Sequence, residues 1–483
     1  DGEQNYAGTA QRLSQRILAS TAATHPDWVF GAADVPKAFL QGLTFDELEA
    51  ETREPRKYIA FTIPKGTLKH LRCVPNFENF NEHQHVLSCL KPGTGCRDAP
   101  RAFSLRLMKT LRNFGMQSTM YDPQLMLLFK NKELAAMISI HVDDIKFTGR
   151  QNDIDRLVKL LEATFGKMTL QFDKFTNCGM THERDKSGNI VMHQDEYIQA
   201  FKPIHPKHYQ GYDIDGPCSE HQQALFMSLL GAVAYTSLTQ VWILVYIVAL
   251  QRKNKQASVS DLKRLNALTR ELMRNPQKLY YRCMTPTQIL EVYSDSAYSR
   301  EGDTAHALKG MICLRLGRSA EGQECSHLLD ALSQSHKLVV RSTFGAELLA
   351  ATSAVDHAFG IALTLHETEA GCLKPDEALQ IRESGGLLIA IKLLIDAMSV
   401  YHSIIQESFK APSEKSLLSH ISWLQEMLHL GLLKIIGWVD TRDMAADGLT
   451  QGKISRDSLL SCMRGTFSRS NPIEIYPRPK GSG

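Results

Sequence analysis

The sequence predicts a protein of three parts: an α+β region built on an antiparallel sheet with helices, a helical segment, and a C-terminal α/β domain. The 483 residues exceed what one ordinary hydrophobic core organises, so we expect about three domains. Apolar residues make up 43% and charged residues 22%, which is the composition of a folded chain and excludes extensive disorder. Strand and helix patterns alternate in both halves, with a purely helical pattern between them.

In the first half, strand patterns lie beside two strong helix patterns. Residues 28–41 read as a strand that ends near Asp34 and turns into a helix. Residues 91–116 read as a Gly/Pro-rich loop that leads into an amphipathic helix. Residues 125–149 predict three strands joined by two tight turns, and residues 153–166 predict another helix. Helices that cross an antiparallel sheet define an α+β region.

Residues 220–275 carry helical patterns, and strands return after them. The stretch Ala224–Leu250 is uncharged, but its polar "TSLTQ" would lie near the middle of a bilayer, so two buried helices are favoured over a membrane span. "ILEVYSDSAYS" and "GMICLRL" predict strands, followed by helices and short strands around Leu394 and Ile436. None of the ten cysteines forms a close zinc-binding pair, and no secretory signal opens the chain, so we expect reduced thiols in an intracellular protein.

A basic helix is predicted at the end of the helical segment. Between residues 252 and 282 there are nine Lys or Arg and only two acids, although the net charge of the whole chain is +3. Ser260 is the predicted N-cap, and Lys263, Arg270 and Arg274 lie outside the apolar stripe. That stripe consists of Leu262, Leu265, Leu268 and Leu272. A solvated surface helix and a track for phosphates are both compatible with this pattern.

Three aspartates of the first half are candidate metal ligands. Asp34 ends a predicted strand, and Asp143 and Asp144 occupy a hairpin tip 109 positions later. Carboxylates held together repel one another unless a cation neutralises them. Mg²⁺ prefers such hard oxygen ligands, and two ions together support phosphoryl transfer. Aspartate is also common in turns for local hydrogen bonding, so the pair alone leaves both interpretations open.

Four acids of the second half form a second candidate set. Their spacings along the chain are 52, 49 and 51 residues. We expect them on a strand, near the start of a helix, at a strand end and entering a helix, respectively: Asp295, Glu347, Asp396 and Asp447. If they converge on one cleft, they suit a divalent metal with water as the nucleophile. Taken singly, each is better explained as a helix cap or a surface acid than as a metal ligand.

The motifs, taken in order, resemble those of copia-type LTR-retrotransposon polyproteins. "DVPKAF", "KPGTGCRDAPRAF" and "HVDD" are similar to the reverse transcriptase palm, and "FGKMTLQFDKFTNCGMTHERDKSGNIVMHQDEYI" is similar to the segment after its catalytic hairpin. "MSLLGAVAYTSLTQ" resembles the connecting region, whereas "YSDSAYS", "RSTFGAELLAAT", "LLIDAMSV" and "GWVDTRDMAADGLTQG" resemble the RNase H domain. The resemblance covers almost the whole chain.

The resemblance implies a role for each candidate residue. Asp34, Asp143 and Asp144 would form the metal-binding triad of an RNA-directed DNA polymerase, and the four later acids would form that of a ribonuclease H, with two Mg²⁺ or Mn²⁺ ions per site. Phe39 falls where the family keeps an aromatic residue under the sugar of the incoming nucleotide, although a core phenylalanine explains it equally well. Arg97 and Arg101, around the loop 91–100, would reach phosphates.

The resemblance also implies domains and partners. Residues 1–200 would hold a fingers remnant and the palm, 201–288 a helical thumb and connection, 289–468 an RNase H-like domain, and 469–483 a C-terminal tail. The expected partners are an RNA template, a DNA primer, the RNA/DNA hybrid, dNTPs and other segments of the polyprotein, with no membrane. The basic segment would hold the hybrid, and the location would be a cytoplasmic particle or the nucleus.

Three departures from the family pattern leave two alternative functions open. His141 stands where the family has an aromatic residue, and "TQVW" replaces an Arg-Pro-Asp run. Only 33 residues precede Asp34, so the fingers are expected to be truncated, and Arg12 and Arg16 are the only arginines in that lead. The alternatives are an impaired retroelement remnant that binds RNA/DNA hybrids, and a chain that retains only RNase H cleavage.

Overall fold

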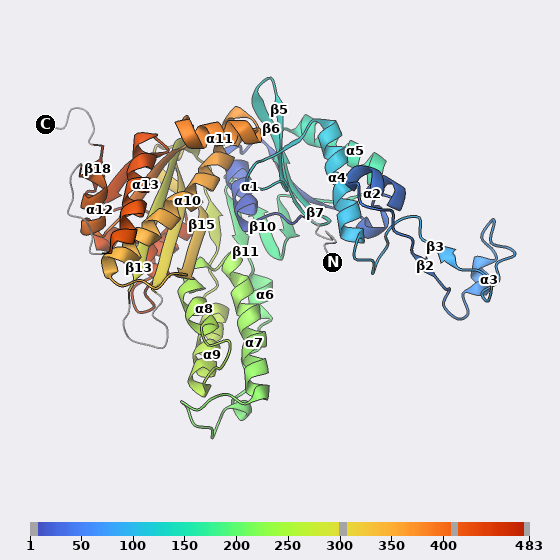
Figure 1. Cartoon of the computed structure of the whole chain (residues 1–483), viewed down its shortest axis with the longest axis horizontal. Helices are drawn as coiled ribbons and strands as arrows, with labels where there is room; N and C mark the ends of the chain where they lie inside the picture. Colours follow the sequence, from blue (N-terminus) through green and yellow to red (C-terminus); the bar gives the residue numbers. More distant parts are fainter. Residues whose placement is uncertain (1–7, 299–306, 407–413, 478–483) are drawn as a thin grey trace.

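The computed structural model describes residues 8–298, 307–406 and 414–477, which form two units, each built on a sheet (Figure 1). A helical segment projects from between the two units, and a slender arm extends from the first unit. Residues 478–483 of the predicted tail lie outside the described residues. The division into sheet, helical segment and sheet follows the order of the sequence patterns.

The first unit is centred on an antiparallel sheet with the strand order β4-β5-β6-β7-β1-β8. The bounds of its strands are β1 (Val29–Asp34), β4 (Gln117–Ser118), β5 (Leu125–Lys130), β6 (Glu133–His141), β7 (Asp144–Gly149) and β8 (Thr169–Phe172). Helices α4 (Ala99–Phe114) and α5 (Gln151–Phe165) bury their apolar faces against one side of it. Helix α1 (Arg12–Thr24) covers the other side. The predicted α+β arrangement of this region is therefore present.

An arm that the sequence patterns did not reveal leaves the first unit between β1 and α4. It follows the short helix η1 (Ala38–Leu40) and contains α2 (Phe45–Thr52), β2 (Ala60–Phe61), α3 (Leu68–Leu71) and β3 (Leu87–Ser88). From residue 53 to residue 90, Phe80 is the one fully buried side chain. The arm therefore has almost no core of its own.

The helical segment begins and ends at a small second sheet. That sheet has the order β12-β11-β10-β9, from β9 (Lys174–Asn177), β10 (Met180–Arg184), β11 (Ile190–His193) and β12 (Leu279–Tyr281). Between β11 and β12 lie α6 (Asp195–Gln199), η2 (Pro206–His208), α7 (Glu220–Tyr235), η3 (Thr236–Leu238), η4 (Val241–Ile243), α8 (Leu244–Gln251) and α9 (Val259–Arg274). The uncharged stretch thus forms two short helices separated by 3₁₀ turns, as expected.

The N-cap of the basic helix differs from the prediction. Ser258, not Ser260, caps α9: its hydroxyl accepts the Asp261 amide, and the Asp261 carboxylate accepts the Ser258 amide at 3.0 Å. This reciprocal pair is a capping box, which satisfies two free amides at once. Ser260 lies within the first turn because the box needs an acid three residues after the cap, and Ser260 has Lys263 at that spacing. The apolar stripe is buried as predicted.

The second unit is a mixed sheet with the order β15-β14-β13-β16-β17-β18. Its strands are β13 (Thr285–Ala297), β14 (Leu308–Arg318), β15 (Glu324–Ser335), β16 (Ala390–Ile395), β17 (Leu433–Trp438) and β18 (Glu474–Tyr476). Its helices are α10 (Thr343–Ala370), α11 (Pro375–Ser384), α12 (Met398–Ile405), η5 (Lys415–Leu417), α13 (Leu418–His429), η6 (Thr441–Asp443), η7 (Ala445–Leu449) and α14 (Asp457–Met463). The sequence patterns did not predict β15. Strand β18 lies inside the predicted tail and pairs with β17.

Helix α10 is the one described helix long and apolar enough to span a membrane by length and composition. Of its most apolar window, 67% is buried inside the fold, where it packs on β13, β14 and β16. A helix buried in this way is apolar on most sides because it is a core helix.

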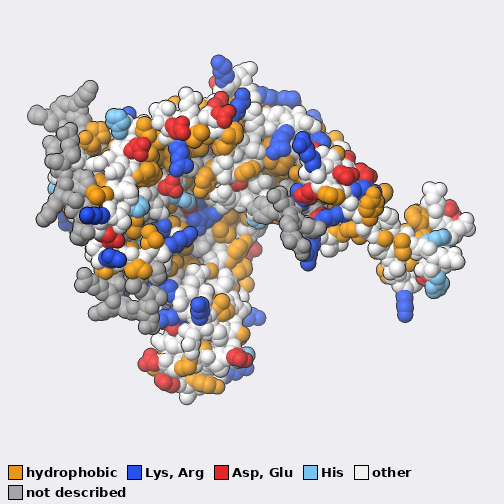
Figure 2. Space-filling view, in the orientation of Figure 1, with side chains coloured by type: hydrophobic (Ala, Val, Ile, Leu, Met, Phe, Trp, Pro, Cys, Tyr) orange, Lys and Arg blue, Asp and Glu red, His pale blue; other side chains and the backbone are white. Residues whose placement is uncertain are grey.

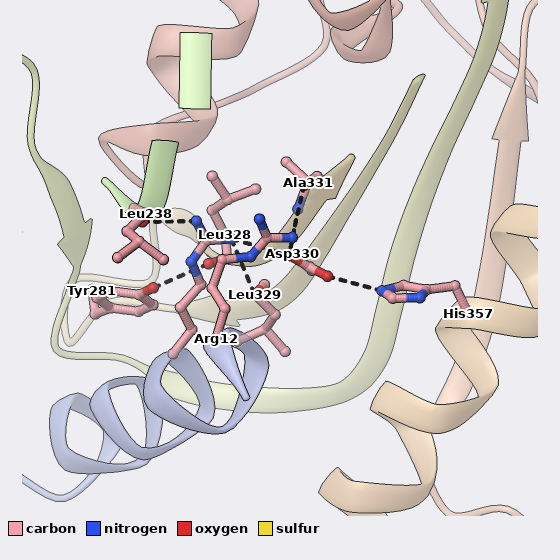
Figure 3. A network of polar contacts seen from close by, with 9 residues as sticks. Arg12, Leu238, Tyr281, Leu328, Leu329, Asp330, Ala331 and His357 are labelled. Carbon is pink, nitrogen blue, oxygen red and sulfur yellow. Dashed lines mark hydrogen bonds and ion pairs between the residues drawn. The ribbon is translucent and has the colours of Figure 1, made fainter. Parts of the chain in front are cut away.

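Helix α1 joins the two units through a buried cluster of charges (Figure 3). Arg12 donates to Asp330 of β15 at 2.6 Å, and Arg16 donates to the same carboxylate at 3.3 Å and to the Leu238 carbonyl at 2.9 Å. His357 of α10 contacts the other Asp330 oxygen at 2.8 Å. Arg16 is 1% exposed and Asp330 is 4% exposed. Burial raises the pKa of Asp330, but Arg12 and the other partners outweigh burial and hold that pKa far below its usual range.

We predict that Asp330→Asn lowers the free energy of unfolding by about 3–5 kcal/mol, because it leaves buried guanidinium charge without a counter-ion. Urea unfolding followed by circular dichroism measures this change. The matched control is Glu51→Gln, which breaks an exposed pair with Lys109 and should change stability by less than about 0.5 kcal/mol. A loss below about 1 kcal/mol for Asp330→Asn would show that the cluster does not hold the units together.

Candidate functional site

The structure brings Asp34, Asp143 and Asp144 together at one end of the first sheet. Asp34 is the last residue of β1, and Asp144 is the first residue of the neighbouring strand β7. The two are directly opposite each other in the antiparallel register. Asp143 lies in the two-residue turn between His141 and Asp144, which pair across β6 and β7. Residues opposite each other on adjacent strands have Cβ atoms about 4.5–5.5 Å apart, so the carboxylates share one small region.

The hairpin that carries this pair has a strained backbone. Val142 has a φ of 61°, which is unusual for a β-branched residue. Backbone of this kind persists only where the surrounding structure fixes it, and it is concentrated at functional sites. Burial, followed by the charges of Asp143 and Asp34, raises the pKa of Asp144. The site therefore holds more negative charge than its own groups neutralise.

The other three residues expected near this site lie on η1, in the loop before α4 and on α4. Phe39 is half-buried in η1, five residues after Asp34, and Arg97 is exposed in the loop before α4. Arg101 forms a two-armed ion pair with Glu54, with distances of 2.7 and 3.0 Å. Its guanidinium is therefore held by a carboxylate in this structure.

The four acids of the second half converge at the sheet of the second unit. Asp295 lies on β13, and Asp396 follows the end of β16, the parallel neighbour of β13. Because the register pairs Tyr293 with Leu394, Asp295 and Asp396 occupy matching positions two residues further on. Glu347, in the second turn of α10, completes a group in which one carboxylate oxygen from each of the three residues lies within 4.8 Å of the other two.

Asp447 joins this group from η7, next to Asp295. Burial and the charge of Asp295 raise the pKa of Asp447, and burial also raises the pKa of Asp295 and of Asp396. Burial, with the charges of Asp295 and Asp396, raises the pKa of Glu347 to about 9. Carboxyl groups so close in a low-dielectric pocket cannot all ionise without a counter-charge.

The donor set of the second group fits a divalent cation. Four carboxyl groups offer hard oxygen ligands, and one Asp447 oxygen is buried with no hydrogen-bond partner among the described residues. A buried carboxylate oxygen without a donor is costly, which a cation would remedy. The first group is more open but has the same chemistry, since Asp34 is exposed and Asp143 and Asp144 are half-buried.

Two threonines orient the second group, and sequence reasoning did not single them out. Thr450 donates its hydroxyl hydrogen bond to Asp295, and Thr441 donates to Asp396 at 3.0 Å. Both belong to the "GWVDTRDMAADGLTQG" stretch that also contains Asp447. Their types gave no signal, because threonine is common in turns and its donor role depends on which strand end lies nearby.

The basic residues of α9 remain available on the surface. Lys263, Arg270 and Arg274 are all exposed, whereas the leucine stripe faces the interior. Lys263 also lies 6.0 Å from the ring centre of Tyr209. Basic side chains are visible on the helical segment and where it joins the two units (Figure 2). These positions are accessible to a polyanion.

The structure thus defines a chain with two separate carboxylate sites, each on its own sheet and each suited to divalent cations. No family model matches the chain. It is similar to the retrovirus-related Pol polyprotein from transposon RE1 of Arabidopsis thaliana, at 22% identity over 470 residues. This similarity covers 93% of the chain and 28% of the relative, so the chain spans a little over a quarter of that polyprotein. The resemblance to a retroelement Pol polyprotein is confirmed.

Two solved structures also match the chain at low similarity, one over a third of its length and one over almost all of it. The crystal structure of LC11-RNase H1 in complex with RNA/DNA hybrid has 13% identity and covers 33% of this chain and 92% of its own, with a TM-score of 0.21. The prototype foamy virus protease-reverse transcriptase has 12% identity and covers 96% of this chain and 70% of its own, with a TM-score of 0.19.

We predict that the cation-free chain becomes less stable as pH rises from about 4.5 towards 9, the interval between the ordinary and the folded pKa of Glu347. The folded state holds a proton on Glu347 that the unfolded state releases, so this group contributes a slope approaching about 1.4 kcal/mol per pH unit. Glu347→Gln should flatten the curve and stabilise the chain at pH 8 in the presence of a chelator. Equal slopes for the parent and the variant in urea unfolding would contradict the raised pKa.

Proposed function

We propose that this chain is an RNA-directed DNA polymerase joined to a ribonuclease H, from an LTR retrotransposon of the copia type. The first unit would be the polymerase palm, the segment α7–α9 the thumb and connection, and the second unit an RNase H-like domain. The observation that carries the proposal is the presence of two carboxylate groups on two sheets of one chain that is similar to a transposon Pol polyprotein. A protein with a single metal-dependent activity would need only one of these two carboxylate groups.

In the first site, Asp34, Asp143 and Asp144 would hold two Mg²⁺ or Mn²⁺ ions. Ions held there would supply activation of the primer hydroxyl for attack on the α-phosphate of the dNTP and stabilise the leaving pyrophosphate. The hairpin presents Asp143 in its two-residue turn and Asp144 at the start of β7, so strand pairing holds the two carboxylates close together before a cation binds. The half-buried ring of Phe39 would contact the sugar of the dNTP, and exposed Arg97 would contact phosphate.

In the second site, Asp295, Glu347, Asp396 and Asp447 would hold the ions that activate water for cleavage of the RNA strand. Thr450 and Thr441 fix the orientation of Asp295 and Asp396 through their hydroxyl groups. The raised pKa of Glu347 means that its proton must leave when a cation binds. Cation affinity at this site should therefore increase with pH.

The partners of this activity follow from the same proposal. The RNA template, DNA primer and hybrid would lie along the exposed basic face of α9, with dNTPs entering at the first site. Other segments of the polyprotein would accompany the chain, in keeping with a function that ends in DNA integration. Its location would be intracellular, in a cytoplasmic particle or the nucleus.

One observation favours the alternative of a chain that retains only the nuclease or only hybrid binding. Arg12 and Arg16, the only arginines before Asp34, are both bound to Asp330. They are therefore not positioned to hold a nucleoside triphosphate. Any basic side chain that contacts the triphosphate must come from elsewhere, such as the arm between β1 and α4.

We predict that Asp143→Asn with Asp144→Asn abolishes primer extension and spares RNA cleavage, whereas Asp396→Asn does the reverse. The reason is that the two carboxylate groups lie on separate sheets. The measurement is extension of a labelled primer and cleavage of a labelled hybrid, with Mg²⁺ or Mn²⁺. Loss of both activities in either variant would refute the two-site interpretation, and cleavage without extension by the parent chain would establish the nuclease-only alternative.

We also predict that replacing Lys263, Arg270 and Arg274 together by Gln weakens hybrid binding and lowers its salt dependence by about one unit of slope for each phosphate contact removed. Fluorescence anisotropy over a range of salt concentrations measures both quantities. The matched control replaces Lys159, Lys167 and Lys186, which are exposed on the first unit and its neighbouring sheet. Unchanged affinity and slope in the α9 variant would place the hybrid elsewhere.

A further inference from the structure

Helix α1 is buried along almost its whole length and contacts both units. Every residue from Leu13 to Ala23 is buried, including Ser14, Gln15 and Arg16. The helix packs on β6 and β7 on one side and on β15 on the other. A helix that a single unit covered would keep an exposed polar face.

The contacts of α1 with the first unit converge on the hairpin that presents Asp143 and Asp144. Gln15 donates its amide hydrogen to Ser139 of β6 at 3.0 Å, and Lys146 of β7 donates to the Gln15 carbonyl at 2.9 Å. Ser139 and Lys146 are directly opposite each other on the two strands of the hairpin. Just before α1, the amide of Ala10 donates to the Ile140 carbonyl at 2.9 Å, next to the turn.

The charged contacts of α1 with the second unit converge on Asp330, and Ser20 of α1 adds hydrogen bonds to β14 and β15. Arg12 and Arg16 reach it from α1, and His357 reaches it from α10, the helix that carries Glu347. Arg12 also donates to the Ala331 carbonyl at 3.2 Å. One carboxylate therefore joins α1, β15 and α10 (Figure 3).

Stability alone does not account for this arrangement. Desolvation of buried charges offsets most of their attraction, and apolar side chains of similar volume often stabilise a protein as well or better. What a hydrogen-bonded ion cluster adds is a single geometry, because a shift of either partner leaves a charge unpaired. The cluster connects α10 to α1, and α1 in turn contacts the hairpin. It therefore fixes the position of the hairpin relative to α10.

We propose that Arg12, Arg16 and Asp330 are positioning residues that fix the first carboxylate site relative to the second. Through α1, they set the length of duplex between the primer end and the position where the RNA strand is cut. This inference rests on the proposed function, since it concerns the spacing of its two reactions. It does not require these residues to touch the nucleic acid.

The test uses the full chain and a hybrid whose DNA primer ends in a dideoxynucleotide, with the RNA template labelled at one end. The primer end then occupies the first site without extension, and gel analysis gives the cut positions relative to it. We expect the parent chain to have one preferred cut position and Arg12→Ala to lose it, with cuts spread over neighbouring positions. Arg12→Lys, which keeps the charge, should restore the preferred position.

Total cleavage of a long hybrid without a primer end separates positioning from a general loss of activity. Arg12→Ala should cleave that substrate at the rate of the parent chain. The control Lys109→Ala, which breaks an exposed pair with Glu51, should keep both the rate and the preferred position. A folded Arg12→Ala chain that keeps the preferred position would overturn the proposal.

Two further measurements keep the test decisive. If Arg12→Ala does not fold, His357→Ala removes the α10 contact and leaves both arginines, and it must lose the preferred position. If the parent chain neither extends nor cleaves, the proposed function fails, and hydrogen exchange tests the positioning role by itself. Arg12→Ala should then lose amide protection in both β6–β7 and α10, and loss in only one of them or in neither would overturn the inference.

Discussion

The buried pairing of Arg12 and Arg16 with Asp330 is the interaction on which the arrangement of the two units depends. It joins a helix near the start of the described chain to a strand more than 300 residues later. Because the cluster has little exposed surface, its charges depend on one another rather than on water. The result is a core shared by both sheets, in which α1 belongs to neither unit alone.

The two carboxylate sites show the opposite electrostatic condition. At Asp330, positive charge is arranged to keep a buried acid ionised, whereas at Asp295 and Glu347 acids gather without an ion pair to any basic side chain in the described part of the chain. Burial and mutual repulsion raise the pKa of these groups and cost the fold stability. A protein that keeps such a cluster gains a cation site in return, which is the usual relation between stability and function at an active site.

The position of the arginines links the fold to the function. A guanidinium bound to Asp330 holds the two units in register. Because its donors are already engaged there, it is not positioned to contact a nucleotide. The arm between β1 and α4 is almost without a core, and its residues from 53 to 90, apart from Phe80, are exposed or half-buried. The chain therefore divides its basic residues between holding the architecture together and facing the solvent, as on α9.

The sequence by itself determined the local elements and the acids that end them. Alternation and turn residues predicted β1 and the β6–β7 hairpin, so the local pattern alone assigned Asp34, Asp143 and Asp144 to strand ends. The same patterns placed Asp295 on a strand and Glu347 near a helix start, because strand and helix periods are local properties. The sequence patterns did not reveal β15, since its inward and outward residues are both buried and it has no simple alternation.

Only the tertiary structure decided what surrounds α1. Ser14, Gln15 and Arg16 are polar, and a local pattern assigns such residues to a solvent-exposed face, yet all three are buried and hydrogen-bonded, to Asp122, to Ser139 of β6 and to Asp330 of β15, respectively. The convergence of four acids from β13, α10, β16 and η7 was likewise decided by which strands lie side by side in the sheet. Residues distant in the sequence become neighbours through packing, and no local period encodes that pairing.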